Sequence, residues 1–299
     1  MTKVIPPGLI EHLAWTPGRP EPPKPIPPPA PPRAPQTSAV VSPFSIENII
    51  ARGQSFYDGK TLGSLKKALE YATPEGILVT MPEMINAKAK ADKSHTFWQE
   101  WKSVHTEENI GIDKSGIHYS RNTPVLILVS GGGLLTPERI ETAYAEGLIS
   151  GSAKYTAQEF KNILEGKIPD GTTIPMHTLE EVKSGKITNY PHKFGIVMPY
   201  QEALGTVSGR QEKGIFMVNP LVIARSAGAL DSLETYFEKA KGSDGVGSYH
   251  PFSGRDPAQP QGRVLYVNSD NDGLIGSYDL DFDASFVGVA PEAPSRAKK

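Results

Sequence analysis

Apolar residues recur at helical spacing in several stretches downstream of residue 43. The first stretch follows Ser45, a residue type that caps helix N-termini, and places Ile46, Ile49 and Ile50 on one face. Thr136 is followed by proline, as at many helix starts. Ranges with this spacing predict helices at residues 45–52, 64–76, 90–112, 136–147, 156–166, 177–185 and 232–242.

Continuous apolar runs predict the strands. The clearest run lies in residues 122–133, and residues 77–84 and 219–228 also read as strands, while 192–204 reads as a strand and a turn. Residues 262–293 read as two apolar strands around a polar loop. Short helices and strands with many turns and no internal repeat predict an α+β fold.

Proline sets the N-terminal segment apart from this pattern. Of the 28 prolines in the 299 residues, 14 precede Ser45. Proline fixes φ and removes a backbone donor, so residues 1–43 are expected to form an extended or disordered arm. The arm is either a plain linker, a ligand for an aromatic groove, or a spacer. Residues 44–299 are expected to form a single globular domain.

Charge and cysteine content exclude several function classes. The net charge is -2, which argues against a strongly basic nucleic-acid binder. The chain has no cysteine, so disulfides, thiol catalysis and cysteine zinc sites are excluded. No apolar run reaches the roughly 20 residues of a membrane span, and the N-terminus lacks the apolar stretch of a signal peptide. Localisation stays open between the cytoplasm, a virion and export by another route.

Two motifs suggest ligand chemistry weakly. Gly131, Gly132 and Gly133 lie between a strand and a helix, where backbone amides can bind a phosphate, or where a tight turn simply needs glycine. Residues 268–279 resemble a calcium loop, with oxygen-bearing side chains at alternating positions and Gly273 at the turn, although strands flank it instead of helices. The histidines show neither metal-ligand spacing nor a readable triad.

The composition of residues 264–290 departs sharply from the rest of the chain. Lys, Glu, Gln, Met and Trp make up 59 of 299 residues but are absent from this window, which holds 5 of the 12 aspartates. Randomising the adenines of the codons AAC and AAT yields Asn, Ser, Asp, Tyr, Gly and Phe, and never yields the five missing types. The alternative is an ordinary Asp/Asn/Gly hairpin loop.

On these residues, the window resembles the variable proteins of diversity-generating retroelements. That resemblance implies a C-type-lectin-like fold related to the formylglycine-generating enzymes, with residues 263–267 entering the variable segment and 285–290 closing it. It implies scaffold roles for Leu274, Ile275, Leu280 and Ala284. The randomised, ligand-binding sites it implies are Asn268, Ser269, Asp270, Asn271, Asp272, Ser277, Tyr278, Asp279, Asp281, Phe282, Asp283 and Ser285.

The expected function is a non-catalytic display protein that binds a protein or a cell-surface ligand and needs no cofactor or metal. Formylglycine-generating chemistry uses copper-binding cysteines in that family, and this chain has none. Tyrosine with small polar residues is also the composition of antibody paratopes. The alternatives are a calcium-binding protein, a structural or virion component, and an enzyme that uses the turn at 131–133 for phosphate.

Overall fold

The computed structural model describes residues 39–73, 75–187, 189–241, 245–250, 252, 254–268 and 274–291. The chain divides into two units, Met1–Ala34 and Pro35–Lys299, and the first lies outside the described residues. All that follows concerns the second unit.

The strands are short, apart from one in the centre. They are β1 (Ala39–Val41), β2 (Gln54–Asp58), β3 (Ile77–Leu78), β4 (Lys102–Asp113), β5 (Thr123–Ser130), β6 (Ala153–Lys154), β7 (Met176–Thr178), β8 (Asn189–Pro191), β9 (Phe194–Pro199), β10 (Gly209–Gln211), β11 (Val246–Tyr249), β12 (Gln261–Val267), β13 (Leu274–Tyr278) and β14 (Ala284–Val289).

Helices alternate with these strands along the chain. They are α1 (Ile46–Arg52), α2 (Thr61–Ala72), α3 (Met81–Lys90), α4 (Thr96–Gln99), α5 (Pro137–Glu146), α6 (Ala157–Leu164), α7 (Leu179–Lys183), α8 (Tyr200–Leu204), α9 (Lys213–Phe216), α10 (Pro220–Arg225) and α11 (Leu230–Ala240). Helices and strands are mixed throughout, so the predicted α+β class is confirmed.

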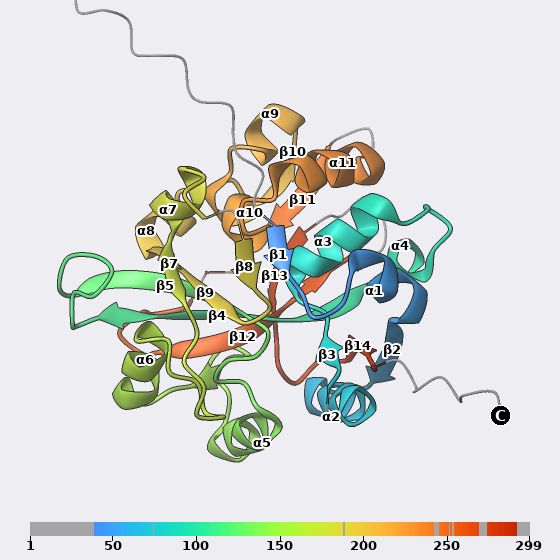
Figure 1. Ribbon diagram of the computed structural model, residues 1–299. Helices are drawn as coiled ribbons and strands as arrows, with labels where there is room; N and C mark the ends of the chain where they lie inside the picture. The colour runs from blue at the N-terminus through green and yellow to red at the C-terminus, as the bar shows by residue number, and fades with distance from the viewer. Residues whose placement is uncertain are drawn as a thin grey trace, which may run out of the picture. The chain divides into compact units, whose positions relative to one another are not determined.

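The main sheet is built around β4. Its principal path runs β10-β11-β13-β12-β4-β5-β9-β7, and β14 joins β4 in parallel while pairing antiparallel with β2 and β3. One group of helices, including α3, α10 and α11, covers one face, and α2, α5 and α6 cover the other (Figure 1).

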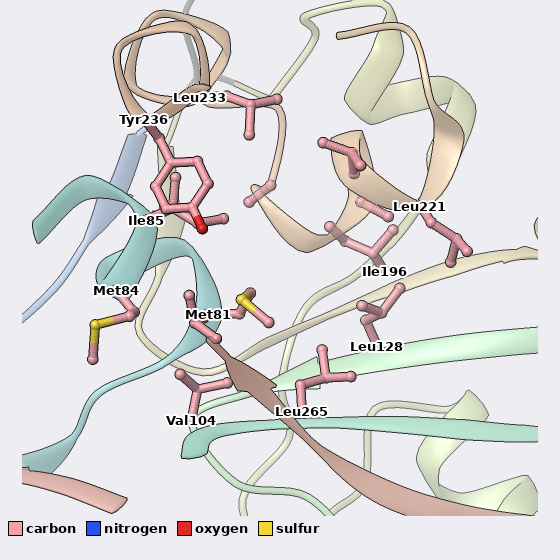
Figure 2. Packing of buried hydrophobic residues seen from close by; sticks show 14 of the residues in the cluster. Met81, Met84, Ile85, Val104, Leu128, Ile196, Leu221, Leu233, Tyr236 and Leu265 are labelled. Atoms are coloured by element: carbon pink, nitrogen blue, oxygen red, sulfur yellow. The ribbon is translucent and has the colours of Figure 1, made fainter. Parts of the chain in front are cut away.

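Strand β5 shows how the sequence fills both faces. Leu126 and Leu128 belong to one buried cluster, and Val125, Ile127 and Val129 belong to the other. Successive side chains of a strand point to opposite faces, so a continuous apolar run is what a strand buried on both sides requires. Figure 2 shows the first cluster, in which Met81, Met84 and Ile85 of α3 pack over side chains of the sheet strands.

The predicted caps formed where the sequence placed them. The side chain of Ser45 accepts a hydrogen bond from the Asn48 amide, and those of Thr136 and Thr156 accept from the amides of Arg139 and Glu159. Each such cap satisfies an amide that the first helical turn leaves without a partner.

The helix predicted at 90–112 is wrong for most of its length. Only Lys90, the last residue of α3, and Thr96–Gln99 are helical, and β4 begins at Lys102. The acidic residues of β4, Glu107, Glu108 and Asp113, are buried inside the protein. Glu108, fully buried, accepts two hydrogen bonds from the buried guanidinium of Arg225 at 2.7 and 3.1 Å. Tertiary ion pairing therefore overrode the local pattern.

Two predicted strands are mainly helices. In residues 77–84, only Ile77–Leu78 is a strand, because a capping box between Thr80 and Glu83 starts α3. In residues 219–228, the side chain of Asn219 accepts hydrogen bonds from the amides of Leu221 and Val222 and starts α10. A short apolar run is compatible with a strand or with a buried helix, so the sequence pattern did not indicate either helix start.

Residues 39–41 lie within the range predicted as a proline-rich arm, yet they form β1 and pair in parallel with β8. These three residues contain no proline, so they keep the backbone donors that strand pairing needs. In the C-terminal window both predicted strands are present, as β12 and β14. The additional strand β13 forms between them.

Candidate functional site

The C-terminal window forms a turn region held between two strands that both pair with β4. Strand β12 pairs with β4 along its whole length, and β14 is buried at every position. Strand β13 returns alongside β12, with an irregular register between Val264 and Tyr266. The segment that carries the predicted ligand-binding residues therefore leaves and re-enters the centre of the sheet.

Buried contacts fix the start of this segment. The ammonium group of Lys88, fully buried on α3, donates to the carbonyl oxygen of Asn268 at 2.6 Å and lies 4.8 Å from the ring centroid of Trp98. A charged donor to a carbonyl gives one of the stronger hydrogen bonds in a protein interior. The chain is thus held at the point where β12 ends.

A second set of contacts fixes the far end, around Asp279 and Leu280. A guanidinium nitrogen of Arg263 lies 2.9 Å from the carboxylate of Asp279, and another donates to Ser152 at 2.7 Å. The amide of Leu280 donates to the carbonyl of Gly151 at 2.9 Å. Gly151 has φ +75°, and a Cβ there would lie 2.2 Å from the Asp279 carboxyl carbon, so this position requires glycine.

In the turn that follows the second anchor and leads into β14, the side chains differ in exposure. Asp281 is exposed and Phe282 is 49% exposed, whereas Leu280 is fully buried. Asp283 is half-buried and accepts a hydrogen bond from the hydroxyl of Tyr57 at 3.3 Å. The negative charge and hydrogen bond of Asp283 raise the pKa of Tyr57.

Aromatic side chains from outside the turn continue this surface. The ring of Trp101 contacts those of Tyr57 and Tyr266 edge to face, with centroid distances of 6.5 and 6.4 Å. Tyr57 is 61% exposed, and Trp101 and Tyr266 are half-buried. These rings come from β2, from the residue before β4 and from β12, and only Tyr266 lies within the window 264–290. The hydroxyl of Tyr57 joins these rings to the carboxylate of Asp283, so aromatic and acidic groups meet on this surface.

The predicted site residues divide into three groups. Asn268 and Asp279 lie at the anchors, and Asp281, Phe282 and Asp283 lie in the turn that follows the second anchor. Ser285 differs from the expectation of a surface position, because it is 5% exposed and its amide donates to the Ser103 hydroxyl within the sheet. Ser269, Asp270, Asn271 and Asp272 lie outside the described residues, as do the side chains of Ser277 and Tyr278. The scaffold positions Leu280 and Ala284 are both buried.

The glycine turn at 131–133 is poorly suited to phosphate. Gly131 and Gly132 have φ values of +80° and +98°, as a tight turn demands. The amide of Leu135, which would have to bind the anion, donates instead to the buried carboxylate of Glu107. A Cβ on Gly133 would lie 2.2 Å from the same carboxylate. The turn is therefore packed against Glu107 in the interior and the Leu135 amide is already engaged, so the geometry speaks against the enzyme alternative.

The calcium alternative meets a similar difficulty at both ends of residues 268–279. The carbonyl of Asn268 is held by the ammonium of Lys88, and the carboxylate of Asp279 by the guanidinium of Arg263. Two nearby cations oppose a divalent ion. Residues 269–273 lie outside the described residues, so the loop interior carries no argument.

Folding brings together one titratable pair that the sequence did not reveal. Nδ1 of His192 lies 2.9 Å from the buried carboxylate of Glu83, 109 positions away in sequence. Burial raises the pKa of Glu83, but the charge and hydrogen bond of His192 outweigh it and hold the pKa below its usual value. Within the described ranges, no three His, Asp or Glu side chains are grouped so that they could hold a metal ion.

The architecture matches a solved structure described as "Accommodation of massive sequence variation in Nanoarchaeota by the C-type lectin fold". The TM-score is 0.60 at 24% sequence identity, and the match covers 80% of this chain and 97% of that chain. The protein therefore has a C-type lectin fold, as the resemblance implied. Neither a protein-family model nor a curated protein matches the sequence. Among the described helices, none combines the length and apolar character needed to cross a bilayer.

Proposed function

We propose that the protein is a non-catalytic ligand-binding display protein whose residues 264–290 are hypervariable. The observation that carries this proposal is the coincidence of two independent features. The window that lacks Lys, Glu, Gln, Met and Trp is also the segment that buried contacts fix at Asn268 and at Asp279, and directly after Asp279 it presents Asp281 and Phe282 to solvent. Exposed positions tolerate substitution with small changes in stability, which a variable surface requires.

The solved structure of similar fold supports the same function by analogy. Its description attributes massive sequence variation to a C-type lectin fold in Nanoarchaeota. Shared fold alone does not fix function, so the proposal for this chain rests on its own window.

The carboxylates and aromatic rings of this surface indicate which chemical groups a partner would present. Asp281 and Asp283 supply carboxylates, and Phe282 with Tyr57 supplies exposed aromatic area. Carboxylates beside aromatic faces suit a partner that presents cationic or hydroxyl groups, because rings attract cations and carboxylates accept hydrogen bonds. We therefore propose a basic protein segment or a hydroxyl-rich cell-surface ligand as the partner of this variant.

The test is sequencing of the gene and its flanks from many clones of one lineage. The proposal expects substitutions confined to adenine-containing codons of the variable sites, a nearby reverse transcriptase, and a near-copy of the window that differs at adenines. Substitutions spread evenly over the gene, with no near-copy, would refute it. Residues 102–113 of β4 serve as the internal control, because buried strand positions should stay unchanged.

A further inference from the structure

A cavity of about 670 Å³ lies at the end of β4 remote from the proposed display surface. It is lined by the end of β4, the turn that follows it, helix α6 and residues 257–260. Strand β14 meets β4 at Ser103, whereas the cavity meets β4 at Ile112. Nine residues of extended strand separate these points by about 30 Å, so the two surfaces are distinct.

The floor of this cavity is apolar and rigid. Phe160 and Leu164 of α6 are each 2% exposed, and Ile112, Pro257 and Pro260 complete the floor. The ring of Phe160 lies directly on β4, since a Cβ on Gly111 would come within 2.5 Å of it. The volume falls in the range of sites that enclose a small molecule.

Three cationic side chains stand at the rim of the cavity. Lys114, Arg121 and Lys161 are exposed and line the cavity, and no carboxylate is among its lining residues. Ala157 and Gln158, in the first turn of α6, add the positive end of the helix dipole.

Three carboxylates belong to residues next to the lining residues: Asp113, Glu165 and Asp256, whose side chain accepts a hydrogen bond from the amide of Ala258 at 2.9 Å. Asp113 accepts hydrogen bonds from the Ser115 hydroxyl and from the amides of Ser115 and Gly116, at 2.6 to 2.9 Å. Glu165 lies 2.6 Å from Lys167 and only 3.8 Å from Lys161. Lys161 is thus shared with Glu165, and the rim cations that form no ion pair with a carboxylate of the described residues are Lys114 and Arg121.

We propose that this cavity binds a small amphipathic anion, namely a carboxylate with a medium-length hydrocarbon body. The hydrocarbon lies against Phe160 and Leu164, and the carboxylate faces Lys114, Arg121 and Lys161. Burial of the hydrocarbon supplies the attraction, and the rim charges select the anion over a cation of the same shape. This site is independent of the proposed display function.

The test is isothermal titration calorimetry of the full chain with decanoate, decyltrimethylammonium and acetate. Decanoate is expected to bind, decyltrimethylammonium to give no heat of binding, and acetate to bind at least roughly 100-fold more weakly because it lacks the apolar body. Equal binding of both ten-carbon compounds would show plain adsorption to apolar surface and overturn the proposal. Absence of decanoate binding at millimolar concentration would also overturn it.

Variants tie the binding to this cavity. The double variant Lys114→Gln/Lys161→Gln should weaken decanoate binding roughly five- to tenfold, as loss of two surface charges does. Ala258→Trp, at an exposed turn position, should fill the cavity and abolish binding while leaving the melting curve unchanged. Lys186→Gln is the matched control, an exposed lysine outside the cavity. Unchanged binding in both cavity variants places the ligand elsewhere and refutes the proposal.

Discussion

Replacement of two neighbouring residues, Leu280 and Asp281, separates the scaffold of the turn from its surface. Leu280 is fully buried, so Leu280→Ala removes packed atoms and leaves a cavity. Such changes cost about 2–5 kcal/mol. At about 2–4 °C per kcal/mol for a unit of this size, the melting temperature should fall by about 5–15 °C. Asp281→Ala, at an exposed position, should change stability by less than about 0.5 kcal/mol.

Substitution of Phe282 by alanine is expected to destabilise the protein more than Asp281→Ala and less than Leu280→Ala. About half of its surface is covered, so at about 25 cal/mol per Å² the substitution Phe282→Ala costs at most about 2 kcal/mol. The assay is calorimetric melting of the full chain and its variants, with Val287→Ala as a second, fully buried comparison. If Asp281→Ala destabilised the protein as much as Leu280→Ala, the turn would be core structure and the separation of scaffold from surface would be refuted.

Three further predictions follow from the geometry. Burial raises the pKa of Glu107 from 4.5 to about 7, so the folded state binds its proton more tightly than the unfolded state, and stability should fall by up to about 3 kcal/mol as pH rises through this interval. Urea unfolding at pH 5 and pH 8 should show this fall in the free energy of unfolding for the native chain and a smaller fall for Glu107→Gln. An equal fall in both proteins would contradict the prediction. Millimolar calcium should leave the melting temperature unchanged because Lys88 and Arg263 hold the loop ends, whereas a clear rise would restore the calcium alternative. Removal of residues 1–34 should leave melting unchanged, but removal of residues 1–43 should lower the melting temperature because it deletes the β1–β8 pairing; identical melting curves would assign β1 to the arm.

Local signals in the sequence predicted the elements that depend on local chemistry. The caps at Ser45, Thr136 and Thr156 and the apolar run of β5 act within a few residues, so they could be predicted. Strand β4 could not, since its charged side chains are acceptable only because Arg225, 117 positions away, pairs with Glu108. A buried charge without such a partner would be costly, and a single sequence does not reveal the partner.

The candidate site divides in the same way. The window composition located the turn, and it also marked Leu280 and Ala284 as fixed positions. The anchors Lys88 and Gly151 and the aromatic neighbours Tyr57 and Trp101 come from distant parts of the chain. Only folding brings them to the turn, so no local pattern could indicate them.

The contacts of Asn268 and Leu280 with distant elements also restrict the number of residues that the chain can have between these two positions. Because the chain is held at Lys88 on one side and at Gly151 on the other, the number of residues between these points must match the distance they span. One residue added to or lost from β13 would shift its register against β12 and turn each of its side chains to the opposite face of the sheet. Point substitution preserves that count, whereas insertion and deletion do not. If the proposed variability holds, lineages of this gene should therefore differ by substitutions, but not by insertions or deletions, between codons 268 and 280.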